Sequence, residues 1–263
     1  METIKSKDNK TIKHISKLIA DSKYRKLNKE FVVEGKRLCK DALLSNCTVV
    51  SALVNEEFYN NSNNKDFIDL LSKESCKKYI VDNRIFSALS DTKTPQGVLF
   101  VLKTLDKNND FDKIIKHGKV LALENIQDPS NLGTILRTAE AFCVNLVVLS
   151  KNCCDIYSPK VVRGSMGAVF RQKIYIADDF IKFIKEYNKI GRSYAAVLDD
   201  ESIKLGKCDF WGPCMAIVGN EGNGLTKDAI LTCTNKLYIP MSGKAESLNV
   251  SVASSLIMWE MMK

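Results

Sequence analysis

The second half of the chain alternates short apolar runs with helical patterns, and this alternation constrains the fold more than any other feature. Most of the runs, which are rich in β-branched and apolar residues, are followed by a segment with helical periodicity. Such alternation predicts a parallel sheet whose strands are joined by crossover helices, with ligands bound beyond the carboxyl ends of the strands. The predicted strands are residues 119–123, 145–149, 172–176, 193–198, 214–218 and 236–239. The predicted helices are residues 131–142, 159–169, 180–187, 227–233 and 247–262.

Two glycine-rich turns follow strands of this half and mark a candidate ligand site. Residues 219–224 follow the run 214–218, and residues 240–249 follow the run 236–239. Glycines permit positive φ angles and let the backbone approach a ligand closely. The spacing matches neither the dinucleotide fingerprint nor the phosphate-binding loop that ends in Gly-Lys-Ser/Thr. The pair therefore predicts a small-molecule site of another kind.

A third stretch, which follows the strand 119–123, carries polar side chains toward the same predicted edge. Pro129 and Ser130 suit a turn into a helix over 131–142, and Ser130 or Asn131 can cap that helix. Arg137 lies six residues beyond Asn131, so the two do not share one helix face. They meet one ligand only if Asn131 sits at the helix start and Arg137 points back toward it. Taken singly, Asn131 is favoured as a helix cap and Arg137 as a surface salt-bridge partner.

The first part of the chain predicts a small α/β domain over residues 1–102. Residues 103–118 are charged and poor in large apolar residues, so they are the expected linker to a second domain over 119–263. The expected strands of the first domain are residues 31–33, 48–54, 78–81 and 98–102, and the expected helices are 3–29, 34–44, 65–71 and 83–89.

The net charge of +8 is concentrated at the N-terminus. Residues 1–30 carry nine Lys/Arg against four Asp/Glu, a net +5. A basic arm of this kind suits a polyanion such as RNA. A solvated, lysine-rich helix face explains the same pattern, and charge alone does not separate the two.

The cysteines and histidines predict no metal site. None of the nine cysteines forms a CxxC pair, and only His14 and His117 could join them as ligands. The absence of a secretory signal and of any long apolar run predicts free thiols, a cytoplasmic location and no membrane partner.

Three blocks of sequence, taken together and in order, are similar to the three motifs of the SpoU (TrmH-like) family of RNA 2'-O-ribose methyltransferases, in the SPOUT superfamily. The blocks are residues 131–139, 219–225 and 239–251. Residues 31–35, 94–97 and 158–168 also resemble family members, so the resemblance covers nearly the whole chain.

The resemblance implies an α/β protein: a C-terminal SPOUT methyltransferase domain with a parallel sheet and a trefoil knot, and a small N-terminal RNA-binding domain similar to ribosomal proteins. It implies a homodimer that uses S-adenosyl-L-methionine to methylate a ribose 2'-hydroxyl. The two-domain layout favours 23S ribosomal RNA over transfer RNA as the substrate. A non-catalytic RNA-binding protein on this fold is the alternative, disfavoured because the motif residues are all present. A nucleotide-dependent oxidoreductase lacks its glycine fingerprint.

The motifs also assign roles to single residues. Carried over from the family motif, Arg137 would be the catalytic residue. Its guanidinium stays charged and is a poor base, so the physical account is that it binds the neighbouring phosphate and favours the developing alkoxide. The proton would pass to that phosphate, to water or to Glu221, although Glu221 could equally pair with an arginine. The residues expected to support catalysis are Asn131, Glu221, Ser247 and Asn249. Those expected to hold the cofactor are Gly219, Asn220, Gly222, Ile239, Met241 and Leu248. Lys160 and Arg163 are candidates for RNA phosphate contacts.

Overall fold

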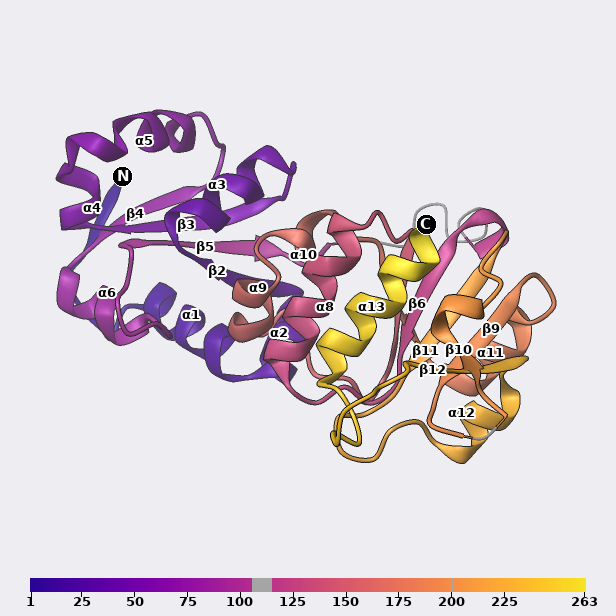
Figure 1. Cartoon of the computed structure of the whole chain (residues 1–263). Helices are drawn as coiled ribbons and strands as arrows, with labels where there is room; N and C mark the ends of the chain where they lie inside the picture. The colour runs from indigo at the N-terminus through magenta and orange to yellow at the C-terminus, as the bar shows by residue number, and fades with distance from the viewer. Residues whose placement is uncertain (106–114, 200) are drawn as a thin grey trace. The chain divides into compact units, whose positions relative to one another are not determined.

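The computed structural model describes residues 1–105, 115–199 and 201–263, and the chain folds into two compact units (Figure 1). Unit 1 contains Met1–Leu105 and Asp155–Phe170, and unit 2 contains Asp106–Cys154 and Arg171–Lys263. Residues 106–114 of the predicted linker lie outside the described residues. Unit 1 takes in a segment, Asp155–Phe170, that lies within the range predicted for the second domain.

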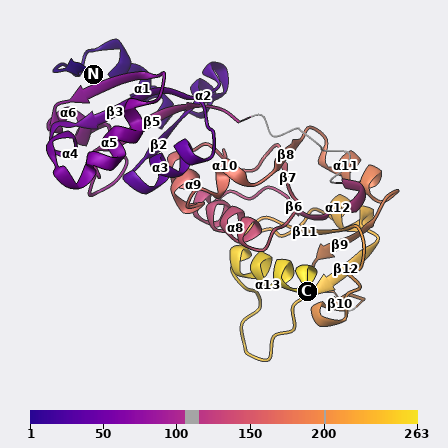
Figure 2. The same ribbon diagram turned by 90° about the horizontal axis from the view of Figure 1, so that it is seen from above.

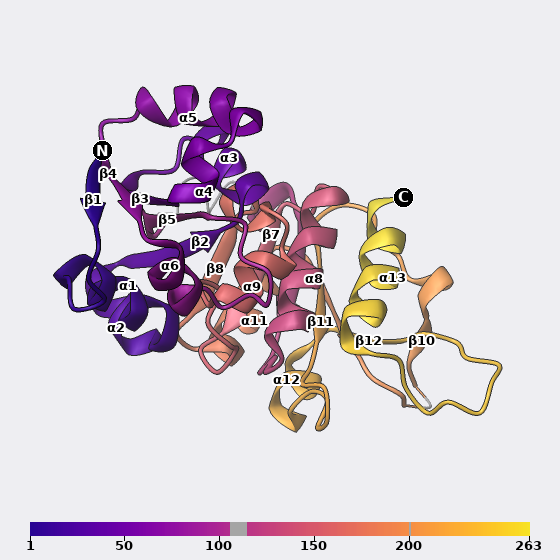
Figure 3. The ribbon, with the colours of Figure 1, turned by 90° about the vertical axis from the view of Figure 1, so that its left-hand side faces the viewer.

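Unit 1 is built on a mixed five-stranded sheet with the order β1-β4-β3-β5-β2. β1 and β3 run parallel to β4, whereas β5 runs antiparallel to β3 and β2. Figure 3 shows β1 at the outer edge beside β4. The strands are β1 (Glu2–Ile4), β2 (Glu30–Glu34), β3 (Val49–Asn55), β4 (Lys77–Val81) and β5 (Val98–Lys103).

The single helix predicted over residues 3–29 is wrong in extent, because this stretch forms a strand and two helices. Asp21 has extended backbone angles that end one helix, and its carboxylate accepts a hydrogen bond from the Lys23 N–H at 2.8 Å to cap the next. The helices of unit 1 are α1 (Lys10–Ala20), α2 (Ser22–Asn28), α3 (Lys36–Leu44), α4 (Glu56–Asn60), the 3₁₀ turn η1 (Ser62–Asn64), α5 (Lys65–Ser72), α6 (Asn83–Leu89) and α9 (Pro159–Gly164).

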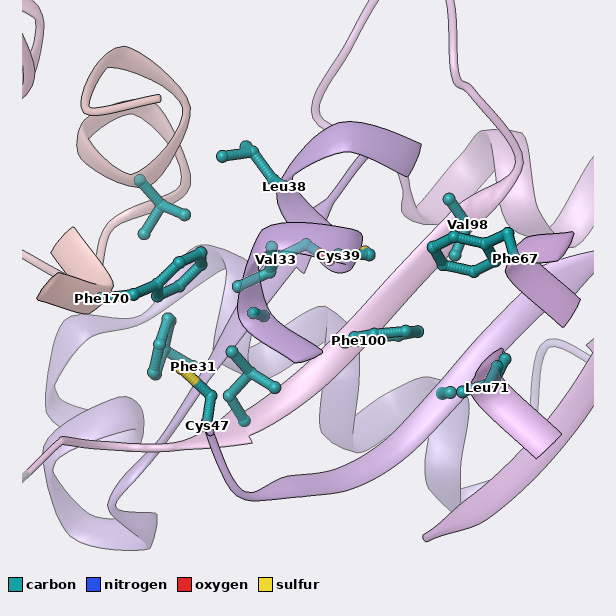
Figure 4. Close-up of a cluster of buried hydrophobic side chains, with 14 of the residues drawn as sticks. Phe31, Val33, Leu38, Cys39, Cys47, Phe67, Leu71, Val98, Phe100 and Phe170 are labelled. Atoms are coloured by element: carbon teal, nitrogen blue, oxygen red, sulfur yellow. Dashed lines mark hydrogen bonds between the residues drawn. The ribbon is translucent and has the colours of Figure 1, made fainter. Parts of the chain in front are cut away.

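The segment Asp155–Phe170 contributes to the core of unit 1. Val162, Val169 and Phe170 join a buried cluster that includes Phe31 and Phe100 (Figure 4). The ring of Tyr157 also packs against Phe31, with centroids 4.4 Å apart. Burial of this apolar surface explains why the segment folds with unit 1.

Unit 2 is built on a seven-stranded sheet in which every strand pair is parallel, with the order β10-β12-β9-β11-β6-β7-β8. This arrangement confirms the predicted parallel sheet. β10 is too short to show a strand pattern in the sequence. The strands are β6 (Lys119–Leu123), β7 (Leu146–Ser150), β8 (Ile174–Ala177), β9 (Arg192–Ala196), β10 (Ile203–Lys204), β11 (Cys214–Val218) and β12 (Asn235–Tyr238).

Helices cover both faces of this sheet (Figure 2). α8 (Pro129–Ala141) packs against α13 (Val250–Met262) on one face, and α11 (Phe180–Tyr187) packs against α12 (Lys227–Thr232) on the other. The 3₁₀ turn η2 (Leu205–Lys207) precedes β11.

The helices predicted over 159–169 and 247–262 also differ from the observed helices in their bounds. The helix predicted over 159–169 is broken into α9 and α10 (Ala168–Arg171), because Met166 and Gly167 have positive φ angles of 50° and 89°. α13 begins at Val250 rather than Ser247, since the Asn249 side chain caps it. No helix among the described residues combines the length and apolarity needed to cross a membrane.

Candidate functional site

A cavity of about 810 Å³ opens at the carboxyl ends of β6, β9, β11 and β12, four neighbouring strands of unit 2. Its walls are the loops that follow these strands and the first turns of α13. The volume falls within the range of about 300–1,000 Å³ that small-molecule sites occupy. The apolar side chains on its walls include Leu198, Leu237, Ile239, Met241, Leu248 and Ile257.

Glu221 joins two of these loops through its carboxylate. One oxygen, Oε1, accepts hydrogen bonds from the Asp128 N–H at 3.0 Å and from Asn131 Nδ2 at 3.1 Å. The other, Oε2, accepts from the Gln127 N–H at 3.1 Å and from Asn220 Nδ2 at 3.3 Å. Both oxygens are therefore occupied by donors that favour the charged form.

These hydrogen bonds determine the protonation of Glu221. Partial burial by itself would raise the pKa of this carboxyl group. The backbone N–H groups, with Asn131, outweigh that effect and lower the pKa below its ordinary value. None of the described residues forms an ion pair with Glu221, so its negative charge faces the cavity without a cationic partner.

A chain of side-chain hydrogen bonds connects all three motifs. Asn131 Nδ2 donates to Glu221, and Asn249 Nδ2 donates to Asn131 Oδ1 at 3.1 Å. The side-chain oxygen of Asn249, Oδ1, accepts from the Ser251 N–H at 2.8 Å and caps α13. The starts of α8 and α13 are thus coupled to the loop after β11.

The glycine-rich loop after β11 closes on itself. Asn220 and Gly224 exchange two backbone hydrogen bonds of 3.0 Å, and Gly224 has a φ of +66°. A Cβ on Gly219 would lie 2.2 Å from the backbone of Gly224. Gly219 is therefore required by the tight closure of its own loop, a reason that differs from the close ligand approach expected from the sequence.

Buried polar groups hold this loop and the next helix in place. Glu124, which is 5% exposed, follows β6 directly. Its two oxygens accept from the Thr226 N–H and the Thr226 hydroxyl, both at 2.8 Å. Thr226 in turn caps α12. The end of β6 is therefore tied to the segment that follows the glycine-rich loop.

Ten of the predicted site residues line the cavity, and Arg137 does not. Arg137 is exposed on α8, about 9 Å along the helix axis from Asn131 at 1.5 Å per residue. Among the described residues it has no hydrogen-bond or ion-pair partner. The lining residues that were predicted are Asn131, Gly219, Asn220, Gly222, Glu221, Ile239, Met241, Ser247, Leu248 and Asn249.

The two candidate RNA-binding residues belong to unit 1 rather than to this cavity. Lys160 is exposed on α9. Arg163 donates from one terminal nitrogen to Asp91 Oδ2 at 2.7 Å, and this ion pair also lies within unit 1. One nitrogen of the Arg163 side chain is therefore already engaged in an ion pair that stabilises unit 1.

The sequence interpretation missed several residues of the cavity wall. Gln127 and Asp128 lie in the loop after the predicted strand 119–123, and Leu198 ends the predicted strand 193–198, so their place at strand ends is the signal that could have identified them. Tyr238 ends β12, and Glu246 lies in the loop before α13. Neither has a local pattern that predicts a wall position.

A parallel sheet with a cavity at its carboxyl edge is the architecture of an α/β enzyme that holds a small molecule between its loops. Residues 118–259 match the SpoU rRNA Methylase family, and residues 9–99 match the MRM3-like substrate binding domain. The 23S rRNA (guanosine(2553)-2'-O)-methyltransferase RlmP of Bacillus subtilis is 31% identical over 271 aligned residues, with 99% of each chain covered.

Solved structures share the fold. The AdoMet-bound rRNA methyltransferase from Sinorhizobium meliloti matches with a TM-score of 0.86 at 24% identity, over 99% of this chain and 97% of that one. A crystal structure of an RNA 2'-O ribose methyltransferase matches with a TM-score of 0.80 at 26% identity, over 99% and 98%. The chain belongs to the SpoU rRNA methylase family, which confirms the prediction from the three motifs.

Proposed function

We propose that this protein transfers the methyl group of S-adenosyl-L-methionine to a ribose 2'-hydroxyl of 23S ribosomal RNA. The hydrogen-bond chain from Glu221 through Asn131 to Asn249 carries the proposal, because it joins the three family motifs at one cavity. RlmP of Bacillus subtilis, which is similar over its whole length, is named for this reaction on 23S rRNA.

The cavity suits S-adenosyl-L-methionine, which supplies a methyl group on a positively charged sulfur. Ile239, Met241 and Leu248 offer apolar surface for an adenine ring, and the backbone at Gly219, Asn220 and Gly222 offers polar groups. The uncompensated carboxylate of Glu221 favours a cationic ligand on electrostatic grounds.

Arg137 acts on the RNA rather than on the cofactor. Its exposed guanidinium binds the phosphate beside the reacting ribose and stabilises the developing alkoxide. Ser247 and Asn249 lie on the cavity wall and orient the ribose. Alignment of this kind is the main requirement of a displacement reaction.

Glu221 is not the proton acceptor in this mechanism. Its lowered pKa makes it a weak base, and its oxygens already accept four hydrogen bonds. The ribose proton passes instead to the RNA phosphate or to water. Glu221 is thus a positioning residue that holds two cavity loops together.

RNA binding involves unit 1 as well. Lys160 is exposed for a phosphate contact, and Arg163 reaches one by exchanging its Asp91 partner. The exposed lysines of α1 and α2, including Lys13, Lys17 and Lys26, extend the basic surface. Contacts of this type would make RNA binding fall steeply with salt.

The protein acts as a homodimer, with the trefoil knot of its family and a cytoplasmic location. Val252, Leu256 and Trp259 are 48%, 41% and 54% exposed at helical spacing on α13, an apolar face that a second copy could cover. Sedimentation velocity at micromolar concentration tests this, and a monomer would contradict it.

Transfer of tritium from labelled S-adenosyl-L-methionine to protein-free 23S rRNA tests the reaction, and alkali-resistant positions locate the methylated ribose. Arg137→Ala should lower turnover by about 10²–10³-fold, the cost of removing one group that stabilises a developing oxyanion. Cofactor affinity, measured by calorimetry, should stay unchanged.

Arg137→Lys is the matched control, which keeps the charge but loses the planar fork and should retain part of the activity. Full turnover in Arg137→Ala would contradict its assignment. Methylation of transfer RNA alone would favour the alternative substrate, and RNA binding without any transfer would favour a non-catalytic protein.

A further inference from the structure

Trp211 is the most exposed large apolar side chain among the described residues, with 87% of its surface accessible. It lies in the loop before β11, near the residues that begin β6 and β9. This edge of the sheet is opposite to the cavity. In Figure 1, α13 runs from the loop that ends at the cavity to the C-terminus at the other end of unit 2.

The loop that presents Trp211 is held firmly. Arg192, at the start of β9, donates to the Asp209 carboxylate and to the Trp211 carbonyl. The backbone N–H of Trp211 donates to Asp209 Oδ1 at 3.0 Å. Lys119, at the start of β6, donates to the Phe210 carbonyl. The indole is therefore displayed on a preorganised backbone, which lowers the entropy lost on binding.

The residue before Trp211, Phe210, anchors the same loop by packing into the interior. Phe210 is 7% exposed and packs edge-on against Tyr194, with ring centroids 5.0 Å apart. The Tyr194 hydroxyl donates to the Asp209 carbonyl at 2.7 Å. Of two adjacent aromatic residues, one is buried and the other is held in solvent.

A hollow of about 610 Å³ lies beside the indole, and its charged lining residues are Lys119, Lys263 and Glu260. Arg192 is matched by Asp209, and Lys263 is matched by Glu260 at 2.9 Å. Lys119 donates to the Phe210 carbonyl and forms no ion pair among the described residues. Besides the Trp211 N–H, the charge of Lys119 helps to lower the pKa of Asp209 from a longer distance. The lining residues are His117, Lys119, Cys208, Phe210, Trp211, Gly212 and 260–263.

We infer that Trp211 and Lys119 form a second RNA contact, in which an unpaired base stacks on the indole and a neighbouring phosphate meets the amine. This inference rests on the proposed action on RNA. A single exposed aromatic among charged groups suits a base and a phosphate better than a protein partner, whose contact surface has an apolar core. The contact lies about 20 Å from the cavity, the length of α13. It therefore captures a segment remote from the methylated ribose.

The test uses the full chain with Trp259→Phe, so that Trp211 is the only indole. A single-stranded RNA of mixed sequence, longer than the roughly 4–16 nucleotides that such surfaces cover, should quench its fluorescence. Trp211→Ala should weaken binding of this RNA about 5- to 150-fold, the loss expected for one stacked base. Trp211→Phe should restore most of the affinity.

The control is Ile176→Ala, which removes another exposed apolar side chain, on β8, and should leave RNA affinity unchanged. Affinity for S-adenosyl-L-methionine should not change in any variant. Unchanged RNA affinity in Trp211→Ala, while methylation of 23S rRNA persists, overturns the contact and leaves the proposed function intact. A loss of self-association without a loss of RNA affinity also overturns it. A wild-type protein that neither binds nor methylates RNA overturns both.

Discussion

Two carboxylates, one in each unit, accept several hydrogen bonds but serve different ends. Glu30 of unit 1 is 8% exposed and bonds to Lys103 Nζ at 2.7 Å and to His14 Nε2 at 2.8 Å. Glu221 of unit 2 is exposed and accepts from backbone and amide groups. Hydrogen bonds lower the pKa of both against the opposing effect of burial.

The difference between them lies in the charge of the donors. The hydrogen-bond donors to Glu30 are Lys103 and His14, which can carry positive charge. They largely neutralise the charge of Glu30 inside unit 1. Glu221 meets neutral donors, so it keeps its charge at the cavity while it holds the loops in place. The first arrangement stabilises a fold, and the second prepares a site. At these two positions, unit 1 uses ion pairs to hold its fold and unit 2 uses neutral donors to hold the loops of the cavity.

The largest effect on stability should come from the buried cation of unit 1, Arg25. It is 5% exposed, pairs with Asp155 at 2.8 Å and donates to the carbonyl of Leu18 at 2.6 Å. Arg25→Met leaves these groups unpaired and should cost about 3–5 kcal/mol of unfolding free energy, measured by urea denaturation.

Lys26→Met, on the next and exposed residue of the same helix, should cost less than about 0.5 kcal/mol. A cost for Arg25→Met as small as that of the control would show that this ion pair does not hold Asp155–Phe170 in unit 1.

A smaller effect, dependent on pH, should follow from Glu30→Gln. The folded pKa of Glu30 lies below its ordinary value of 4.5, so its contribution is fully present above pH 4.5 and is lost as the pH falls through the lowered value. The variant should be less stable by about 1–2 kcal/mol at pH 7, and the difference should shrink in acid. A difference that grew as the pH fell would contradict this sign.

The same substitution at Glu221 should have the smallest effect on stability, at most about 1 kcal/mol, because the site is exposed. Its effect on function should be clearer. Glu221→Gln should lower the affinity for S-adenosyl-L-methionine, because it loosens two loops and removes a negative charge from the cavity.

The pH dependence of turnover separates positioning from base catalysis at Glu221. If Glu221 positions the loops, the profiles of wild type and variant should keep the same shape. The disappearance of an acid limb in Glu221→Gln, with cofactor affinity unchanged, would identify Glu221 as the base after all.

Local patterns predicted the centre of the sheet of unit 2 well, because β6, β7 and β11 are almost wholly buried. The run 214–218 is apolar throughout and forms β11 within the predicted bounds. β1 and β10 were missed, since runs of three and two residues have no periodicity to detect. The break between α1 and α2 was missed because Asp21 acts through two side-chain hydrogen bonds rather than through a glycine or a proline.

The candidate site also divides into features that local patterns predicted and features that they did not. Ten predicted residues line one cavity because their motifs follow parallel strands, whose carboxyl ends share an edge. The roles of Ser247 and of the cofactor residues stay predictions. So do the knot, which strand order does not specify, and the domain boundary at 103–118.

By itself, the sequence determined the family, the alternation of strands and helices in unit 2, and the edge at which the site forms. These properties depend on short segments, whose periodicity and turn residues are visible one stretch at a time. Only the tertiary structure decided that Asp155–Phe170 folds with unit 1, that Gly219 serves its own loop, and that Glu221 is held by donors from residues 127–131. The first and the last depend on contacts between residues far apart in the chain, and the second depends on how tightly one loop closes, neither of which a local pattern records.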